Sequence, residues 1–164
     1  MADLPALPDG LTVRPLRADD VTDAAALLEA AERVDDTGEH WSPEDLAEWW
    51  VNDLFDLERD SLVVRSAAGD LVAWATVLAL PDFREAFRIT LEARVHPDWR
   101  GAGLGARMLR HLEDRARELG HRRIHLDTNG TLVEAIAMYR AAGYADVARY
   151  NDNPYAEAWF AKDL

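Results

Sequence analysis

The sequence of 164 residues contains no cysteine. This absence excludes disulfide bonds, thiolate metal ligands and a cysteine nucleophile. The sequence also has no apolar run that approaches the roughly 20 residues needed to span a bilayer. Its first ten residues lack the basic and apolar regions of a secretory signal. We therefore expect a cytoplasmic protein that has no membrane partner.

A recognisable metal-binding pattern is also missing. The histidines show neither the HExxH pattern nor any other paired spacing typical of metal ligands. We therefore predict no metal site. The histidines concerned are His40, His96, His111, His121 and His125.

Basic residues are scarce relative to acidic ones, and the formal net charge is −13. A surface of this sign disfavours nucleic acid and anionic membranes as partners. The charge is unevenly distributed, because residues 29–60 are rich in acids whereas residues 100–123 are basic on balance. Either the acids simply keep the protein soluble, or an acidic half accepts a cationic substrate beside an anionic cofactor.

The hydrophobic patterning predicts a mixed α/β fold, because strands alternate with helices in the second half. The length fits one domain, which we place at residues 11–164 after an N-terminal extension at residues 1–10. A Gly69-Asp70 turn predicts a hairpin within residues 61–80. Further strands are predicted at residues 11–16, 87–96, 122–128, 145–150 and 156–162, and helices at residues 21–31, 43–57, 104–119 and 132–142.

The segment "HPDWRGAGLGARML" places glycines at every second position, Gly101, Gly103 and Gly105, directly before a predicted helix. One interpretation is a turn with packing duties only. A second is a dinucleotide-binding fingerprint, but four residues separate the preceding strand from Gly101, where that fingerprint needs the glycine at the end of the strand. A Walker loop is excluded because no lysine follows the glycines.

The third interpretation is a pyrophosphate cradle at the N-terminus of a helix. Backbone N–H groups that no side chain obstructs would point at the anion, and the helix dipole would add a favourable potential. Arg100, directly before the first glycine, would supply a fixed positive charge. The sequence has both features that this arrangement needs, the arginine before the glycines and the helix after them.

The same residues carry a resemblance to a known family. "RGAGLG", residues 100–105, is similar to the R/Q-x-x-G-x-G/A signature of the GNAT superfamily of N-acetyltransferases. The preceding "VHP", the later "AIAMYRAAGY" at residues 135–144 and the ending "RYNDNPYAEAWFAK" are also found in such proteins. The resemblance extends over the element order of essentially the whole chain. It implies the GNAT fold, a single mixed sheet of about six to seven strands flanked by about four helices.

The resemblance further implies that acetyl-CoA is the co-substrate and lies between two strands that splay apart, the one ending at residues 95–96 and the one at residues 122–128. The acceptor would be a primary amine of a small cationic molecule that enters from the opposite side. A homodimer is left open, since dimers are common in the family. The implied cofactor-binding residues are Val95, His96, Arg100, Gly101, Ala102, Gly103, Leu104, Gly105, Ala106 and Asn129.

Two residues are candidates for catalysis by the same resemblance. Tyr139 matches the family tyrosine that protonates the departing thiolate, although its pattern alone also fits a core aromatic residue. Glu92, on the face of its strand opposite Val95, is the candidate base, and the alternative is a carboxylate paired with Arg94. Without cysteine, direct transfer in a ternary complex is the simpler scheme.

Three features leave alternatives open. Leu132 stands where the family often has asparagine, so Asn129 is the candidate replacement, unless "TNG" is only a turn. The segment at residues 151–155, "NDNPY", either lines the acceptor site or turns a hairpin. Trp41, Trp49 and Trp50 form either a cation pocket with Glu39, Asp45 and Glu48 or the core face of a helix.

Two other functions compete with this interpretation. A non-catalytic acyl-CoA-binding module of the same fold would keep the cradle without the chemistry. A nucleotide-dependent oxidoreductase or methyltransferase would use the glycines differently, and the loop before Gly101 disfavours it.

Overall fold

The computed structural model describes residues 7–51, 56–79 and 89–164. Within these residues the chain forms seven strands and five α-helices, in the element order that the sequence predicts apart from one additional short helix at Leu57–Asp60. The strands are β1 (Thr12–Arg14), β2 (Ser61–Arg65), β3 (Leu71–Ala79), β4 (Ile89–Val95), β5 (Arg123–Thr128), β6 (Ala145–Asp146) and β7 (Ala158–Asp163). The α-helices are α1 (Val21–Asp35), α2 (Pro43–Trp50), α3 (Leu57–Asp60), α4 (Leu104–Glu118) and α5 (Val133–Ala141).

The first four strands form an antiparallel sheet in the order β1-β2-β3-β4. Alternating side chains of β3 enter two separate cores, as the pleat of a strand requires. Trp74 packs with α1 and α2 on one face of the sheet, whereas Ala73 and Ala75 pack with α4 on the other. This sheet is therefore covered on both faces, which explains why β3 is apolar almost throughout.

The last three strands form a second antiparallel sheet in the order β5-β7-β6. Phe160 at the centre of β7 is fully buried, and Tyr139 of α5 packs against it with ring centroids 5.8 Å apart. The predicted single sheet is thus built from a four-stranded and a three-stranded part, and the α/β class is confirmed.

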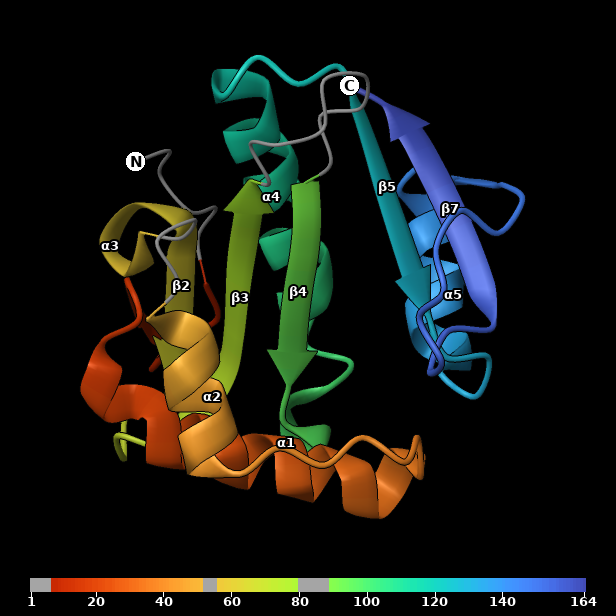
Figure 1. The fold of residues 1–164 in the computed structure, drawn as a ribbon. Helices are drawn as coiled ribbons and strands as arrows, with labels where there is room; N and C mark the ends of the chain where they lie inside the picture. Colours follow the sequence, from red (N-terminus) through yellow and green to blue (C-terminus); the bar gives the residue numbers. More distant parts are fainter. Residues whose placement is uncertain (1–6, 52–55, 80–88) are drawn as a thin grey trace.

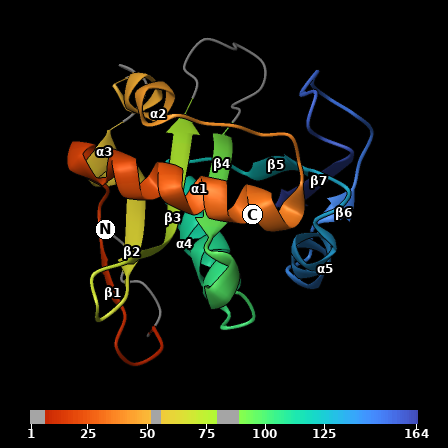
Figure 2. The ribbon, with the colours of Figure 1, turned by 90° about the horizontal axis from the view of Figure 1, so that it is seen from below.

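The two parts meet at β4 and β5, which are neighbours and run in the same direction (Figure 1). In the described part of the chain no backbone ladder joins these two strands, and each is the edge of its own sheet. They diverge toward their C-terminal ends, and α1 crosses the sheet at that end (Figures 1 and 2). The splayed strand pair expected from the sequence is therefore present.

Two predicted elements differ from the structure. The helix expected through residue 57 ends at Trp50, and a new helix, α3, begins where the Asp56 side chain accepts hydrogen bonds from the Glu58 and Arg59 N–H groups. The strand expected at residues 145–150 is only the two-residue β6, because the chain then turns toward Asp127. Leu54, Leu80, Phe87, Arg88 and the predicted extension up to residue 6 lie outside the described residues.

None of the helices in the described residues is both long and apolar enough to cross a membrane. The longest, α1 and α4, have 15 residues each.

Candidate active site

The glycine segment forms an open cradle at the start of α4. Gly101 and Gly103 have φ values of 74° and 76°, a region that side-chain-bearing residues rarely adopt. The helix begins directly afterwards at Leu104, so the first N–H groups of α4 have no acceptor within the helix. A Cβ at Gly101 or Gly103 would meet no described atom within 4 Å. These residues fit a bound pyrophosphate, because the N–H groups are available and the space above the glycines is open.

Gly105 has a different reason to be glycine. A Cβ at this position would lie 3.2 Å from the Met138 sulfur of α5, so the absence of a side chain lets α4 pack closely on α5. The side chain of Leu104 is buried in the core between the sheet and α4. Gly105 is therefore explained by packing between helices, whereas positions 101 and 103 favour glycine because of their positive φ values.

The Arg100 side chain is held by an acid of α1. Its two terminal nitrogens lie 2.6 and 2.7 Å from the two carboxylate oxygens of Asp35, and its Nε donates to the Val95 carbonyl at 3.4 Å. The guanidinium fork that the sequence assigned to the pyrophosphate is thus engaged with a carboxylate here. A contact between Arg100 and a phosphate stays a prediction.

Three of the other predicted cofactor residues, Val95, His96 and Asn129, have local contacts of their own. Val95 ends β4 and packs against the core under α4. His96 accepts a hydrogen bond from the Asp98 N–H at 3.2 Å and so caps a short 3-10 helix, a structural role. Asn129 accepts from the Thr131 N–H at 2.9 Å and from the Thr131 hydroxyl at 2.8 Å, which is the turn alternative.

Glu92 and Arg94 lie on the face of β4 opposite Val95 and form an ion pair. One guanidinium nitrogen of Arg94 is 3.1 Å from Glu92 and 2.9 Å from Glu39. Burial raises the pKa of Glu92, Arg94 lowers it less strongly, and the charge of Glu39 raises it further. One arginine between two carboxylates leaves a net negative charge on this face when both are ionised.

Tyr139 of α5 lies in an aromatic cluster, where its ring centroid is 6.1 Å from that of Tyr144. Burial raises the pKa of its hydroxyl, Arg94 lowers it and Asp127 raises it, so Tyr139 is protonated at neutral pH. The positive charge of Arg94 thus lowers the pKa of both Tyr139 and Glu92. The charge of Arg94 therefore reaches both predicted catalytic residues, although Glu92 comes from β4 and Tyr139 from α5.

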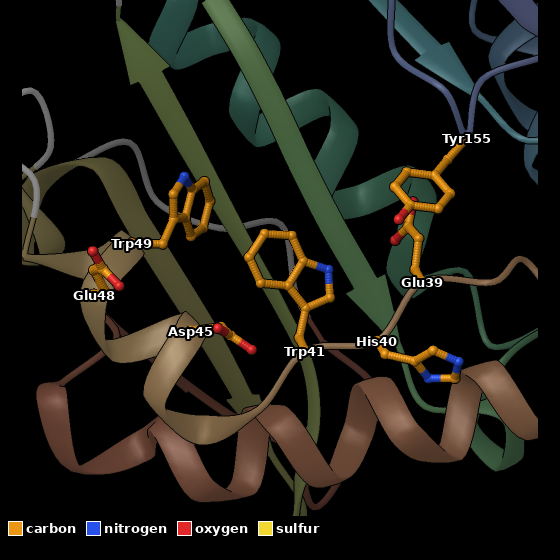
Figure 3. Close-up of a pocket in the computed structure, with 7 residues that line it drawn as sticks. All are labelled: Glu39, His40, Trp41, Asp45, Glu48, Trp49 and Tyr155. Atoms are coloured by element: carbon orange, nitrogen blue, oxygen red, sulfur yellow. The ribbon is translucent and has the colours of Figure 1, made fainter.

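A pocket of about 610 Å³ opens on the Glu92 face of the sheet. Tyr155 and Glu39 stand at one end, Asp45 and Glu48 of α2 stand at the other, and Trp41 lies between them (Figure 3). Trp41 and Trp49 pack with ring centroids 6.4 Å apart. We call this the acidic aromatic pocket, and its described lining is Glu39, His40, Trp41, Asp45, Glu48, Trp49 and Tyr155.

The sequence left two alternatives for this region, a cation pocket and the core face of a helix, and its residues divide between a pocket lining and the core. Trp50 is 3% exposed and packs edge-on against Trp74 with centroids 6.1 Å apart, so it belongs to the core. The other five predicted residues line the pocket.

Asp127 at the end of β5 is a residue that the sequence interpretation did not assign to the site. Its carboxylate accepts hydrogen bonds from Asn151 at 2.5 Å, Asn153 at 2.7 Å and the Tyr150 hydroxyl at 3.3 Å. These bonds fix the loop that carries Tyr155 into the pocket. The paired asparagines of "NDNPY" are the sequence signal that could have revealed a shared partner.

Comparison with known proteins identifies the family. Residues 25–144 match the model described as "Acetyltransferase (GNAT) family". The chain belongs to the GNAT family of acetyltransferases. No curated protein sequence matches it significantly.

Solved GNAT structures share the fold along most of this chain. A putative acetyltransferase from Acinetobacter baylyi has a TM-score of 0.76 and 17% identity over 94% of this chain and 93% of its own. A putative acetyltransferase from Salmonella typhimurium, solved with its cofactor acetyl-CoA, has a TM-score of 0.73 and 17% identity over 95% of both. A GCN5-related N-acetyltransferase from Sphaerobacter thermophilus has a TM-score of 0.75 and 23% identity, and this chain covers only 45% of its length.

For this GNAT acetyltransferase no cluster of three or more potential metal-ligating side chains occurs in the part of the chain that the structure describes.

Proposed function

We propose that this GNAT acetyltransferase transfers the acetyl group of acetyl-CoA directly to the primary amine of a small cationic acceptor. The observation that carries the proposal is the acidic aromatic pocket, which opens on the same face of β4 as Glu92. The donor and acceptor sites then lie on opposite sides of the sheet edge at β4.

The donor site would combine the cradle with the gap between β4 and β5. An edge strand offers backbone groups that can pair with an extended amide-bearing chain, as the pantetheine arm is. Val95 ends the β4 edge just before the cradle, where the N–H groups at residues 101–106 would hold the pyrophosphate. The β4 edge and the cradle would then form one continuous binding surface for the cofactor.

The acceptor site favours a positive charge for two reasons. Glu39, Asp45 and Glu48 place carboxylates around the pocket, and only Glu39 among them is paired with Arg94. Trp41 and Trp49 add aromatic rings, which attract cations through their quadrupoles. An acidic acceptor would be repelled, since the pocket is negative overall.

Glu92 would prepare the acceptor for attack. An ammonium has no lone pair, so it must lose a proton before its nitrogen can form a bond to the acetyl carbon. Burial raises the pKa of Glu92, which makes its carboxylate a stronger base than an exposed one. The bond from nitrogen to the acetyl carbon then forms as the carbon–sulfur bond breaks.

Tyr139 would complete the transfer by giving its proton to the departing sulfur of CoA. A raised pKa keeps the hydroxyl protonated at neutral pH, so it has a proton to give as the carbon–sulfur bond breaks and negative charge develops on sulfur. The nearby charge of Arg94 stabilises the phenolate that remains, until a proton released by the amine restores the hydroxyl.

The proposal is tested in two stages. A thermal-shift assay should show stabilisation by acetyl-CoA and CoA but not by NAD or S-adenosylmethionine. Release of CoA thiol is then followed with 1-aminobutane, 1,4-diaminobutane, aminoglycosides, taurine and glutamate as acceptors. We expect the cationic amines to react and glutamate to be inactive. The non-catalytic module would instead bind acetyl-CoA and release no thiol with any amine.

A matched pair of variants tests the pocket. Glu48→Gln should raise KM for cationic amines several-fold and leave acetyl-CoA affinity unchanged. Glu44→Gln, an equal charge change on the same helix outside the pocket lining, should have no effect on either. Equal KM values in both variants would place the acceptor elsewhere.

A further inference from the structure

We propose that Arg100 is a positioning residue, which binds Asp35 and so holds the acceptor-side loop after α1 in register with the cofactor cradle. The inference rests on the proposed function for the identity of the two sites. The Arg100–Asp35 contact would fix the acceptor-side loop relative to the cofactor cradle. The pyrophosphate would then be bound by backbone N–H groups instead of the Arg100 side chain.

The contact between the two residues is bidentate and partly buried. The Arg100 nitrogens lie 2.6 and 2.7 Å from the Asp35 oxygens, and the two side chains are 30% and 14% exposed. Planar fork-to-fork pairs of this kind are among the more directional polar contacts in proteins. Sixty-five positions separate the partners in the sequence, so the pair joins two distant segments.

Asp35 stands at the end of α1, where one further contact and one backbone conformation fix the chain. The Asp35 carbonyl accepts a hydrogen bond from the Thr131 hydroxyl at 3.4 Å, which ties the helix end to the loop before α5. Asp36 follows with a φ of 49°, a left-handed conformation that ends the helix abruptly. The chain therefore leaves α1 in a defined direction directly after the residue that Arg100 binds.

From this point the chain runs directly into the acidic aromatic pocket. Glu32 accepts hydrogen bonds from the Thr37 and Gly38 N–H groups at 3.0 and 2.7 Å, which fold the loop back on α1. Glu39 then pairs with Arg94, and Trp41 enters the pocket. A shift of Asp35 would thus move the residues that line the acceptor site.

Electrostatics also favour this role over direct phosphate binding. Turning Arg100 to a phosphate would leave the Asp35 carboxylate, only 14% exposed, without its strongest partner and close to a second anion. The N–H groups of the cradle carry no such penalty, because the helix start already leaves them without acceptors.

The two roles predict opposite results for two variants, measured by calorimetric titration with CoA. If Arg100 binds phosphate and Asp35 competes for it, Asp35→Asn tightens CoA binding and Arg100→Gln weakens it tenfold or more. If the pair positions the loop, both variants change the CoA dissociation constant in the same direction and by less than about threefold, and the double variant resembles either single one.

Hydrogen exchange of the peptide spanning residues 36–42 gives a second readout. We expect both variants to increase its deuterium uptake relative to the wild type, whereas Asp146→Asn, which removes an equal charge from the exposed pair with Arg140, leaves it unchanged. With an amine from the acceptor panel, the positioning role raises KM more than it lowers kcat, a split that a general loss of stability would not produce.

The inference would be overturned if Asp35→Asn tightened CoA binding while Arg100→Gln weakened it. Unchanged deuterium uptake in residues 36–42 of both variants would also overturn it. A wild-type protein that fails to bind CoA at all would instead refute the proposed function, so the two failures are distinct. Because the titration and the exchange experiment need no acceptor, both give an answer even if no amine of the panel reacts.

Discussion

Asn153 donates a hydrogen bond of 2.7 Å to Asp127, and this bond ties the loop of the acceptor pocket to the end of β5. Asn151 donates to the second oxygen of the same carboxylate at 2.5 Å, while the oxygen of its side-chain amide accepts from the Trp159 indole N–H at 2.8 Å. One carboxylate thus organises a loop that has little regular backbone pairing of its own.

Asp127→Asn should loosen this loop, because the amide replaces one acceptor oxygen with a donor that faces the asparagine donors. We expect KM for the amine to rise about tenfold, the size of one lost charge-assisted hydrogen bond. Asp152→Asn, a change of the exposed acid in the same loop, is the control and should leave KM unchanged. The role of Asp127 fails if both variants give the same KM.

Tyr139→Phe should lower kcat about 100-fold, a typical loss for a missing general acid, while the melting temperature changes little. The phenyl ring keeps the packing against Phe160 and Tyr144 and removes only the hydroxyl. Tyr144→Phe, in the same aromatic cluster, serves as the comparison and should retain most of the activity. A wild-type rate for Tyr139→Phe across the pH range would show that another group protonates the thiolate.

Glu92 should give kcat/KM a characteristic pH dependence. As a base it works only when ionised, so activity rises with pH as the carboxylate loses its proton, above the ordinary pKa of about 4.3 because burial raises it. Glu92→Gln cannot ionise and should lose this limb together with about 100-fold in rate. A pH–rate profile measures both effects. An unchanged acidic limb in the variant would reduce Glu92 to the ion-pair partner of Arg94.

Gly103→Ala should weaken CoA binding through strain at the cradle. An alanine at a φ of 76° costs about 1 kcal/mol, although the space around it is open. Gly69→Ala, at a φ of 92° in the β2–β3 turn and equally free of neighbours, should cost similar stability. Calorimetry with CoA separates them, since only the cradle variant should lose affinity. Equal affinity in both would remove Gly103 from the binding site.

Asp20 should make the fold sensitive to acid. Burial opposes its ionisation, but hydrogen bonds from Arg14, Arg65 and the Arg17 N–H outweigh it and lower the pKa from 3.8 to about 2. The ionised form therefore stabilises the fold above pH 3.8, and this contribution is lost as the pH falls through 3.8 toward 2.

Asp20→Asn should accordingly lower the free energy of unfolding at neutral pH by about 2 kcal/mol and flatten its decrease toward low pH. Urea titrations between pH 2 and pH 7 measure both quantities. Asp19→Asn changes the neighbouring exposed acid and should follow the wild-type profile. Parallel curves for Asp20→Asn and the wild type would contradict the assignment.

The sequence by itself determined the features that depend on neighbouring residues. Alternation in β4 and the helical spacing in α4 predicted the α/β class, because these periods reflect local backbone geometry. Gly101 and Gly103 identified the cradle, since their backbone conformation is set within one turn. The motif around Tyr139 then pointed to the GNAT family.

Only the tertiary structure decided which distant side chains meet. Arg100 faces Asp35 across 65 positions, and Asp127 faces Asn153 across 26, and neither pairing has a periodicity that a sequence can display. Trp49 and Trp50 are adjacent in the sequence, yet one lines the acidic aromatic pocket and the other lies in the core. A helix separates neighbouring side chains by about 100°, and what each then meets depends on the packing of the whole chain.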